Sequence, residues 1–354
     1  MIEDLESLAR WRHRANAQPK GRVVLDLEAD SLHRYKERLC LIQYADAEGV
    51  CVIDPLAIED LRLFSDWLAE SDIWMHGADY DMSLFLHAFN RMPHFINDTQ
   101  TAARLLGFRQ FGLAALVQHF FGVTLSKSNQ KANWGRRPLP PSLQEYARGD
   151  VAYTLEMADS LTDGLRRAGR YDWFLETCAQ NMRRAAERHE TSFHEAWRIK
   201  GSGRLNRRGL AALRSLWTWR DHEASLMDRP AFFVCSNEQL LQWSAALQDF
   251  RPVAPPPRFN RSRAALFNGA VRRFLALDED EYPERLFHRH AAHDDYYERR
   301  VDHWLSLRDA AAVRLGLEPS FLAARAAMEA LAQDEETGAA HLMNWQKEAL
   351  GIAC

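Results

Sequence analysis

The run VVLDLEADS, residues 23–31, places three carboxylates in a stretch that favours a β-strand. Side chains alternate along a strand, so Asp26 and Glu28 are expected on the same face. Neighbouring carboxylates repel each other, and burying an unpaired charge is costly. Either this strand lies at a solvated edge, or a divalent cation lies between the two side chains.

Further acidic positions favour the cation. Asp81, in HGADYDMSLF, lies where a strand-like stretch gives way to a helix, and Tyr146 and Asp150 share one face of a predicted helix. Carboxylates gathered at the end of a sheet supply the hard oxygen ligands that suit Mg²⁺ or Mn²⁺. Such clusters usually hold two ions about 3.5–4 Å apart, which activate a water in phosphoryl chemistry.

The elements that must position these residues alternate through the first half of the chain. Strands are predicted over residues 23–29, 38–45, 49–55 and 73–78, and helices over 58–70, 81–90, 99–107, 112–122 and 142–158. This order implies an α/β fold, a mixed sheet flanked by helices. From about residue 175 the strand signal fades and helices are expected, with the Pro-rich stretch 251–258 as a linker.

Composition limits the classes of function. The five cysteines are scattered without a CxxC pair, which argues against a disulfide framework and a zinc–thiolate site. No run of about 18 apolar residues occurs, so a cytoplasmic protein without a membrane partner is expected. The net charge is −4, yet residues 127–138, 198–220 and 251–273 carry basic side chains and no acidic one. These segments fit a polyanionic partner.

Four motifs in order, with all five expected functional positions, resemble the ribonuclease D family, the tyrosine branch (DEDDy) of the DEDD 3′→5′ exonucleases, over roughly residues 1–175. They are DLEADS…Y…CLIQ, HGADYD, KSNQKANW…RPL and Y-x-x-x-D. The resemblance implies a ribonuclease-H-like sheet and two divalent cations, Mg²⁺ or Mn²⁺. It assigns Asp26 to bridging both cations, and Glu28 to holding one cation and the terminal 3′-hydroxyl. Asp81 and Asp150 complete the metal ligands, and Tyr146 orients the attacking water.

The helical half has its own resemblance. Residues 196–241 are similar to the HRDC domain, and residues 305–332 look like a second, divergent copy. We therefore predict an exonuclease domain over 1–175 and HRDC-like helical domains over 190–250 and 259–354. RNA contacts are predicted at basic and aromatic positions, namely Tyr35, Lys127, Lys131, Arg136, Arg204, Arg207 and Arg208.

These observations predict a monomeric 3′→5′ exoribonuclease that releases 5′-mononucleotides from RNA 3′ ends. Maturation of RNA 3′ ends, such as those of tRNA, or RNA turnover is the expected role. A DNA 3′→5′ exonuclease is the first alternative, because the ligand set does not distinguish the two sugars. A non-catalytic nucleic-acid scaffold is the second, and the intact set of acidic residues speaks against it.

Several other residues have competing interpretations. Asp79 lies two positions before Asp81 and is its rival as a ligand, although the motif favours Asp81. Asp98 is expected to cap the following helix, and His76 to hydrogen-bond inside the fold. Gln43 lines the substrate groove or packs in the core. The His/Asp cluster at 288–295 matches no zinc arrangement and is expected on a solvated surface.

Overall fold

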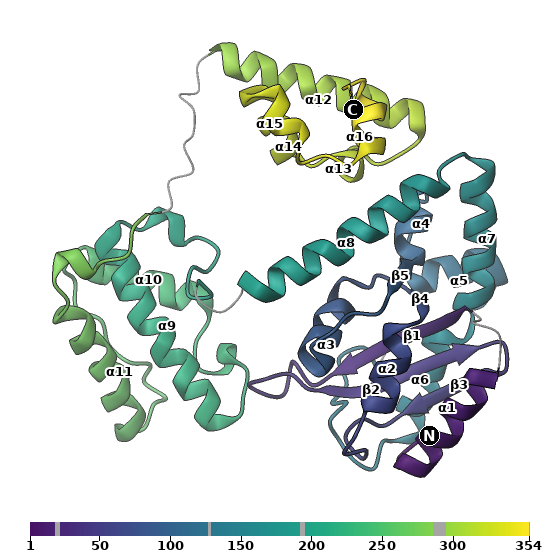
Figure 1. Ribbon diagram of the computed structural model, residues 1–354. Helices are drawn as coiled ribbons and strands as arrows, with labels where there is room; N and C mark the ends of the chain where they lie inside the picture. The colour runs from purple at the N-terminus through teal and green to yellow at the C-terminus, as the bar shows by residue number, and fades with distance from the viewer. Residues whose placement is uncertain (18–21, 127–128, 192–194, 286–294, 354) are drawn as a thin grey trace. The chain divides into compact units, whose positions relative to one another are not determined.

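The computed structural model describes residues 1–17, 22–126, 129–191, 195–285 and 295–353 (Figure 1). The chain divides into two compact units. The first unit comprises residues 1–29, 39–189 and 291–354, and the second comprises 30–38 and 190–290. The first unit therefore contains the whole sheet and also the C-terminal helices.

A five-stranded sheet forms the centre of the first unit, in the order β3-β2-β1-β4-β5. Its strands are β1 (Val23–Ala29), β2 (Leu39–Asp46), β3 (Gly49–Ile53), β4 (Asp72–Met75) and β5 (Phe95–Asp98). β1 pairs with β2 antiparallel and with β4 parallel. The predicted mixed sheet is thus confirmed, and β1 lies at its centre rather than at an edge.

Alternation along β1 separates an apolar face from an acidic one. Leu25 and Leu27 are buried on one face, in a cluster with side chains of α1 (Leu5–Ala17), α2 (Arg62–Ala69) and α3 (Asp79–Phe89) and with Ala185 of α8 (Tyr171–Thr191). Asp26 and Glu28 therefore project to the opposite face, and Leu27 points away from them, as the sequence predicts.

The opposite face of the sheet is covered by a second group of helices. They are α4 (Thr99–Leu105), α5 (Leu113–Phe121), α6 (Pro141–Ala152), α7 (Thr154–Arg167) and α8 (Tyr171–Thr191). Ala147 of α6 packs over Leu41 of β2 and Val52 of β3 in one apolar cluster. The acidic face of β1 is consequently enclosed by helices.

The C-terminal helices pack within the first unit. They are α12 (Asp295–Leu315), α13 (Pro319–Leu322), α14 (Arg325–Gln333), α15 (Glu335–Ala339) and α16 (Asn344–Leu350). Leu317, Leu331 and Trp345 share a core with Phe174 of α8. At Gly107, which has a φ of +84°, an added Cβ would meet the carbonyl oxygen of Gly316 at 2.6 Å. The domain predicted over residues 1–175 therefore omits the C-terminal helices, which form part of the core of the same unit.

The second unit is a helical bundle. Its main helices are α9 (Arg207–Met227), α10 (Asn237–Gln248) and α11 (Arg261–Leu275), with 3₁₀ turns η1 (Ser202–Arg204), η2 (Ala231–Phe233) and η3 (Glu279–Glu281). Phe267 and Phe274 of α11 are buried in the same core as Leu213 of α9. The Pro-rich stretch is therefore not a linker between domains, and the structure places α11 with α9 and α10 rather than with the C-terminal helices. An apolar core decides this grouping, which local composition could not indicate.

Local predictions mostly agree with the structure. The strand over 23–29 has the predicted bounds, and the helix predicted over 142–158 is divided at Tyr153 into α6 and α7. The short strand β5 was missed, because FIND carries little apolar alternation. Across the described part of the chain, no helix is long and apolar enough to cross a membrane.

Candidate active site

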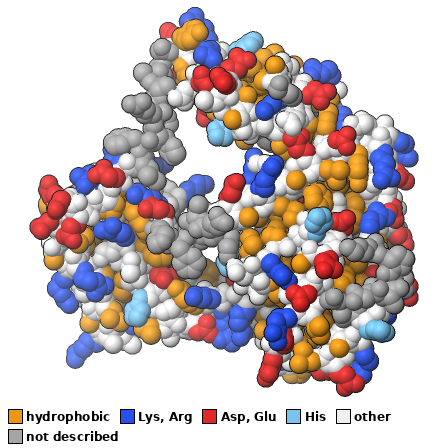
Figure 2. All heavy atoms as spheres, in the orientation of Figure 1, with side chains coloured by type: hydrophobic (Ala, Val, Ile, Leu, Met, Phe, Trp, Pro, Cys, Tyr) orange, Lys and Arg blue, Asp and Glu red, His pale blue; other side chains and the backbone are white. Residues whose placement is uncertain are grey.

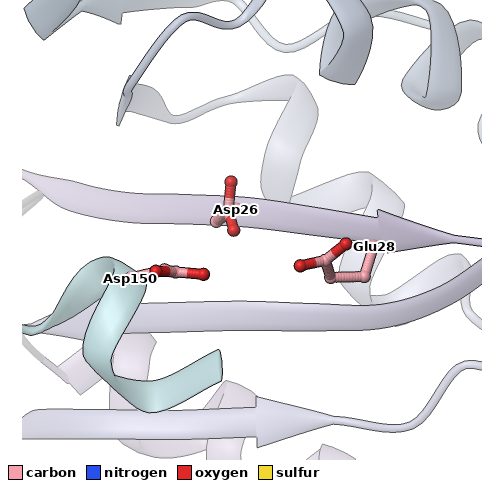
Figure 3. Close-up of side chains that lie close together, drawn as sticks. All are labelled: Asp26, Glu28 and Asp150. Carbon is pink, nitrogen blue, oxygen red and sulfur yellow. The ribbon is translucent and has the colours of Figure 1, made fainter. Parts of the chain in front are cut away.

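Three carboxylates from two elements meet on the enclosed face of the sheet. Ligand oxygens of Asp26, Glu28 and Asp150 all lie within 4.8 Å of one another. Figure 3 shows Asp26 and Glu28 side by side on β1 and Asp150 entering from α6, with the Glu28 and Asp150 carboxylates directed toward each other. Oxygen atoms at this spacing, all from carboxylates, fit a divalent cation.

Asp81 joins this group from the first turn of α3. It is buried, and its Oδ1 accepts a hydrogen bond from the amide of Leu27 at 3.1 Å. That amide lies between Asp26 and Glu28 in the chain, so the bond fixes Asp81 beside the strand. Asp81 is not within the 4.8 Å group of three. The four predicted ligands are nevertheless brought to one region of the molecule.

Burial changes the acidity of all four carboxyls. Loss of solvent raises the pKa of Asp26 and that of Asp150 to about 7. Burial and then the charges of Asp26, Asp150 and Asp81 raise the pKa of Glu28 to about 9. The pKa of Asp81 is also raised, by burial first and by Asp26 second. Without cations, the carboxyl groups of this cluster resist ionisation. Bound cations would favour the ionised form of the same groups.

Tyr146 lies one helical turn before Asp150. Its hydroxyl hydrogen-bonds to Asp150, and burial raises the tyrosine pKa above its usual value, so the hydroxyl stays protonated. Its ring packs against the fully buried Trp134, with ring centroids 6.0 Å apart. Tyr146 is therefore a hydrogen-bond donor held in position beside the carboxylates.

An arginine anchors the loop that carries Trp134. The Arg137 guanidinium donates to both carboxylate oxygens of the buried Asp54, at 2.5 and 2.6 Å. It also donates to the carbonyl oxygens of Trp134 and Cys40, at 2.8 and 2.7 Å. The loop before α6 is thus fastened to β2 and the end of β3, which holds Trp134 behind Tyr146. The sequence singled out Arg136 in this loop and missed Arg137.

A cavity opens beside the tyrosine and Asp150. Its volume is about 360 Å³, and Gln110, Ser126 and Gln130 contribute polar groups to its lining, together with Tyr146 and Asp150. This space lies within the usual range for pockets that hold small molecules. Gln110 and Ser126 were missed, because loop residues without a motif give no signal in one sequence. Gln130 lies inside the KSNQKANW motif, but no role was predicted for it.

The rival candidates have other partners. Asp79 is exposed and forms an ion pair with Arg188 at 2.5 Å. Asp98 caps α4, as predicted, by accepting from the amide of Gln100 at 2.8 Å. His76 contacts the Thr99 hydroxyl at 2.9 Å, and burial lowers the histidine pKa. These arrangements support Asp81 over Asp79 as a member of the cluster.

The predicted RNA-contacting residues occupy varied environments. Lys131, Arg136 and Arg204 are exposed. Lys127 lies outside the described residues, as do positions 288–294 of the His/Asp cluster. Tyr35 belongs to the second unit, where its hydroxyl donates to Asp221 at 2.7 Å.

Arg207 and Arg208, also in the second unit, bond to protein oxygens. Arg207 donates to the Tyr282 carbonyl at 2.9 Å, and Arg208 donates to the Tyr282 hydroxyl at 3.1 Å. On the face in Figure 2, basic and acidic side chains are interspersed over this unit. The arginine-rich segments 198–220 and 251–273 contain no acidic residue in the sequence, but on this face the surface of the unit that contains them also carries acidic side chains.

Comparison with known proteins gives consistent matches. Residues 1–166 match a 3′-5′ exonuclease family, and residues 209–247 match the HRDC domain. Ribonuclease D of Xanthomonas oryzae is 32% identical over 69% of this chain and 70% of that protein. Ribonuclease D of Cronobacter turicensis is 35% identical over 70% of this chain and 66% of that protein.

A solved structure extends the match. The crystal structure of RNase D from Escherichia coli, described as an exoribonuclease involved in structured RNA processing, has a TM-score of 0.75 and 27% identity. That match covers 94% of this chain and 89% of the other. Some sequence alignments are shorter and span 62% of the Musicola paradisiaca protein and 58% of the Haemophilus influenzae protein, both ribonuclease D.

Proposed function

The chain belongs to the ribonuclease D family, and on this basis we propose that it is a 3′→5′ exoribonuclease that removes 5′-mononucleotides from RNA. The observation that carries the proposal is the convergence of Asp26, Glu28 and Asp150 within 4.8 Å, beside a cavity of about 360 Å³. Structured RNAs such as tRNA precursors are the proposed substrates, since the related Escherichia coli enzyme is described as acting in structured RNA processing.

The four carboxylates would hold two divalent cations, Mg²⁺ or Mn²⁺. Asp26 would bridge them, Glu28 would hold one cation and the terminal 3′-hydroxyl, and Asp81 and Asp150 would complete the set. Bound there, the cations would activate a water and neutralise charge on the leaving oxygen. The oxygen-only donor set and the raised carboxyl pKa values support this assignment.

The protein's own contribution is orientation. The Tyr146 hydroxyl, held by Trp134 and Asp150, would position the attacking water through a hydrogen bond. The terminal nucleotide would occupy the cavity lined by Gln110, Ser126 and Gln130. A side chain that positions and polarises a reacting group typically contributes about 10²–10⁴-fold in rate.

Phosphate contacts are proposed outside the catalytic residues. Lys131 and Arg136 are exposed in the loop that ends at α6, and Lys127, which lies outside the described residues, stays a prediction as a phosphate contact. In the second unit, Tyr35, Arg204, Arg207 and Arg208 stay predictions as RNA contacts. The likeness of residues 305–332 to a second HRDC copy, the monomeric state and the cytoplasmic location are proposals of the same standing.

Gel analysis of RNA and DNA of the same sequence tests the function. We expect a 5′-labelled single-stranded RNA to shorten stepwise with Mg²⁺ or Mn²⁺ and to stay intact in EDTA, with 5′-mononucleotides as products. A blocked 3′ end should prevent shortening. Faster degradation of the DNA would favour the alternative DNA exonuclease. Binding of RNA without degradation under all three conditions would favour the scaffold.

A further inference from the structure

Gln43 lies directly beside the catalytic strand. On the antiparallel pair formed by β1 and β2, its Cα is opposite that of Asp26. Directly opposite residues of such a pair direct their side chains to the same face, with Cβ atoms about 4.5–5.5 Å apart. The Gln43 side chain therefore shares the enclosed face with Asp26, under α6.

The amide of Gln43 is an uncompensated polar group. The residue is 0% exposed, and neither its Nε2 nor its Oε1 has a hydrogen-bond partner among the described residues. Each buried polar group without a partner costs about 1–3 kcal/mol. A leucine of similar volume would fit this position without that cost, so packing alone does not explain a glutamine here.

We propose that Gln43 is a positioning residue of the metal centre: its amide nitrogen, which has no partner among the described residues, turns to donate to the Asp26 carboxylate when cations are bound and holds that carboxylate in the cation-binding orientation. This inference rests on the proposed function and adds a residue to it. The chemistry suits an amide, because it donates a hydrogen bond without adding another negative charge to the cluster. A glutamate would add that charge, and an apolar side chain would remove this side-chain donor.

The proposal and a purely structural role predict different properties for Gln43→Leu. If the amide is only a buried polar group, its removal should stabilise the protein and leave cation binding unchanged. If it positions Asp26, the variant should be at least as stable in EDTA, yet should bind Mn²⁺ about 10–100-fold more weakly, the usual effect of losing a group that orients a ligand. Stability and cation affinity then change in opposite directions.

Thr162→Val is a matched control. Thr162 is 6% exposed on α7, its hydroxyl has no partner among the described residues, and it lines the same cavity as Asp72 at the start of β4. Valine removes this uncompensated polar atom in the same unit without altering volume. We expect the control to retain the Mn²⁺ affinity of the wild type.

The experiment is calorimetric titration of the full-length chain with Mn²⁺ alone, together with thermal unfolding in EDTA and at saturating Mn²⁺. The proposal expects weaker binding and a smaller Mn²⁺-induced rise in melting temperature for Gln43→Leu than for Thr162→Val. Equal affinity in the two variants would overturn it. Gln43→Met, which keeps the length of the side chain but removes the donor without adding a charge, should also bind more weakly if the first variant misfolds. A wild type that fails to bind Mn²⁺ would instead overturn the proposed function.

Discussion

Trp173 of α8 and Trp345 of α16 stack with ring centroids 5.2 Å apart and ring planes 18° apart. The indole nitrogen of Trp345 donates to the Thr177 hydroxyl at 3.1 Å, and the Glu176 carboxylate accepts from the amides of Asn344 and Trp345. Residues near the end of the chain thus complete the core of the unit that holds the carboxylates.

This contact predicts that Trp345→Ala destabilises the catalytic unit. Trp345 is 2% exposed, and truncating a buried tryptophan to alanine typically costs about 3–5 kcal/mol. Urea unfolding of the full-length chain measures the loss. Val313→Ala on α12, at a residue 82% exposed, is the control and should change stability little. Equal stability of the two variants would mean that the C-terminal helices do not support this unit.

Asp26→Asn should abolish turnover while RNA binding persists. The substitution removes the charge proposed to bridge both cations and keeps the size of the side chain. In EDTA the variant should be slightly more stable, because burial and neighbouring carboxyls disfavour a charge at this position. Single-turnover RNA degradation and RNA binding in EDTA provide the two measurements. Activity within about tenfold of wild type would contradict the assignment of Asp26.

Tyr146→Phe should lower kcat by about 10²–10⁴-fold with a smaller change in KM, because it removes the hydroxyl and keeps the ring packed against Trp134. Tyr153→Phe, at the junction of α6 and α7, removes a hydroxyl outside the carboxylate cluster and serves as the control. Steady-state kinetics on a short RNA would compare the variants. An unchanged kcat for Tyr146→Phe would assign this residue to packing alone.

The raised carboxyl pKa values predict how the metal-free protein responds to pH. The folded state holds protons on Asp26, Asp150 and Glu28 up to about pH 7, 7 and 9, well above the usual 3.8 and 4.5. The folded state therefore binds more protons than the unfolded chain between about pH 4 and 9, and stability falls as pH rises through this window.

Melting temperatures in EDTA between pH 5 and 9 test this prediction, with Glu28→Gln as the variant that lacks the group of highest pKa. We expect its melting temperature to fall less than that of the wild type as pH rises. Because cations compete with protons for these oxygens, Mn²⁺ affinity of the wild type should increase over the same range. Parallel melting curves for the two proteins would argue against a raised pKa at Glu28.

Local sequence patterns predicted the catalytic strand and the mixed sheet. The alternation in VVLDLEA reports which side chains share a face, and that relation depends only on neighbouring residues. The choice of Asp81 over Asp79 followed from a family motif, whereas the junction of strand and helix at which Asp81 lies was predicted from the local sequence pattern. Two groupings depend on contacts between residues far apart in the chain, and local patterns did not predict them. They are the packing of α11 with α9 and the contact of α16 with α8.

The environment of Gln43 could not be predicted from the sequence. An amide within an apolar strand is compatible with a groove or a core, and one sequence does not distinguish them. Burial of the side chain and the lack of partners for its two polar atoms emerge only when the strands and α6 are placed together. The same holds for Arg137, whose contacts with Asp54 join residues far apart in the chain.

The discontinuous first unit has a consequence for biosynthesis. The proposed catalytic residues lie between positions 26 and 150, but the core of the unit that holds them is completed only by helices α12 to α16. A ribosome that proceeds from the N-terminus must therefore produce the entire intervening bundle before α16 can pack against α8. We expect the nascent nuclease to acquire its full stability only after α16 has emerged from the ribosome.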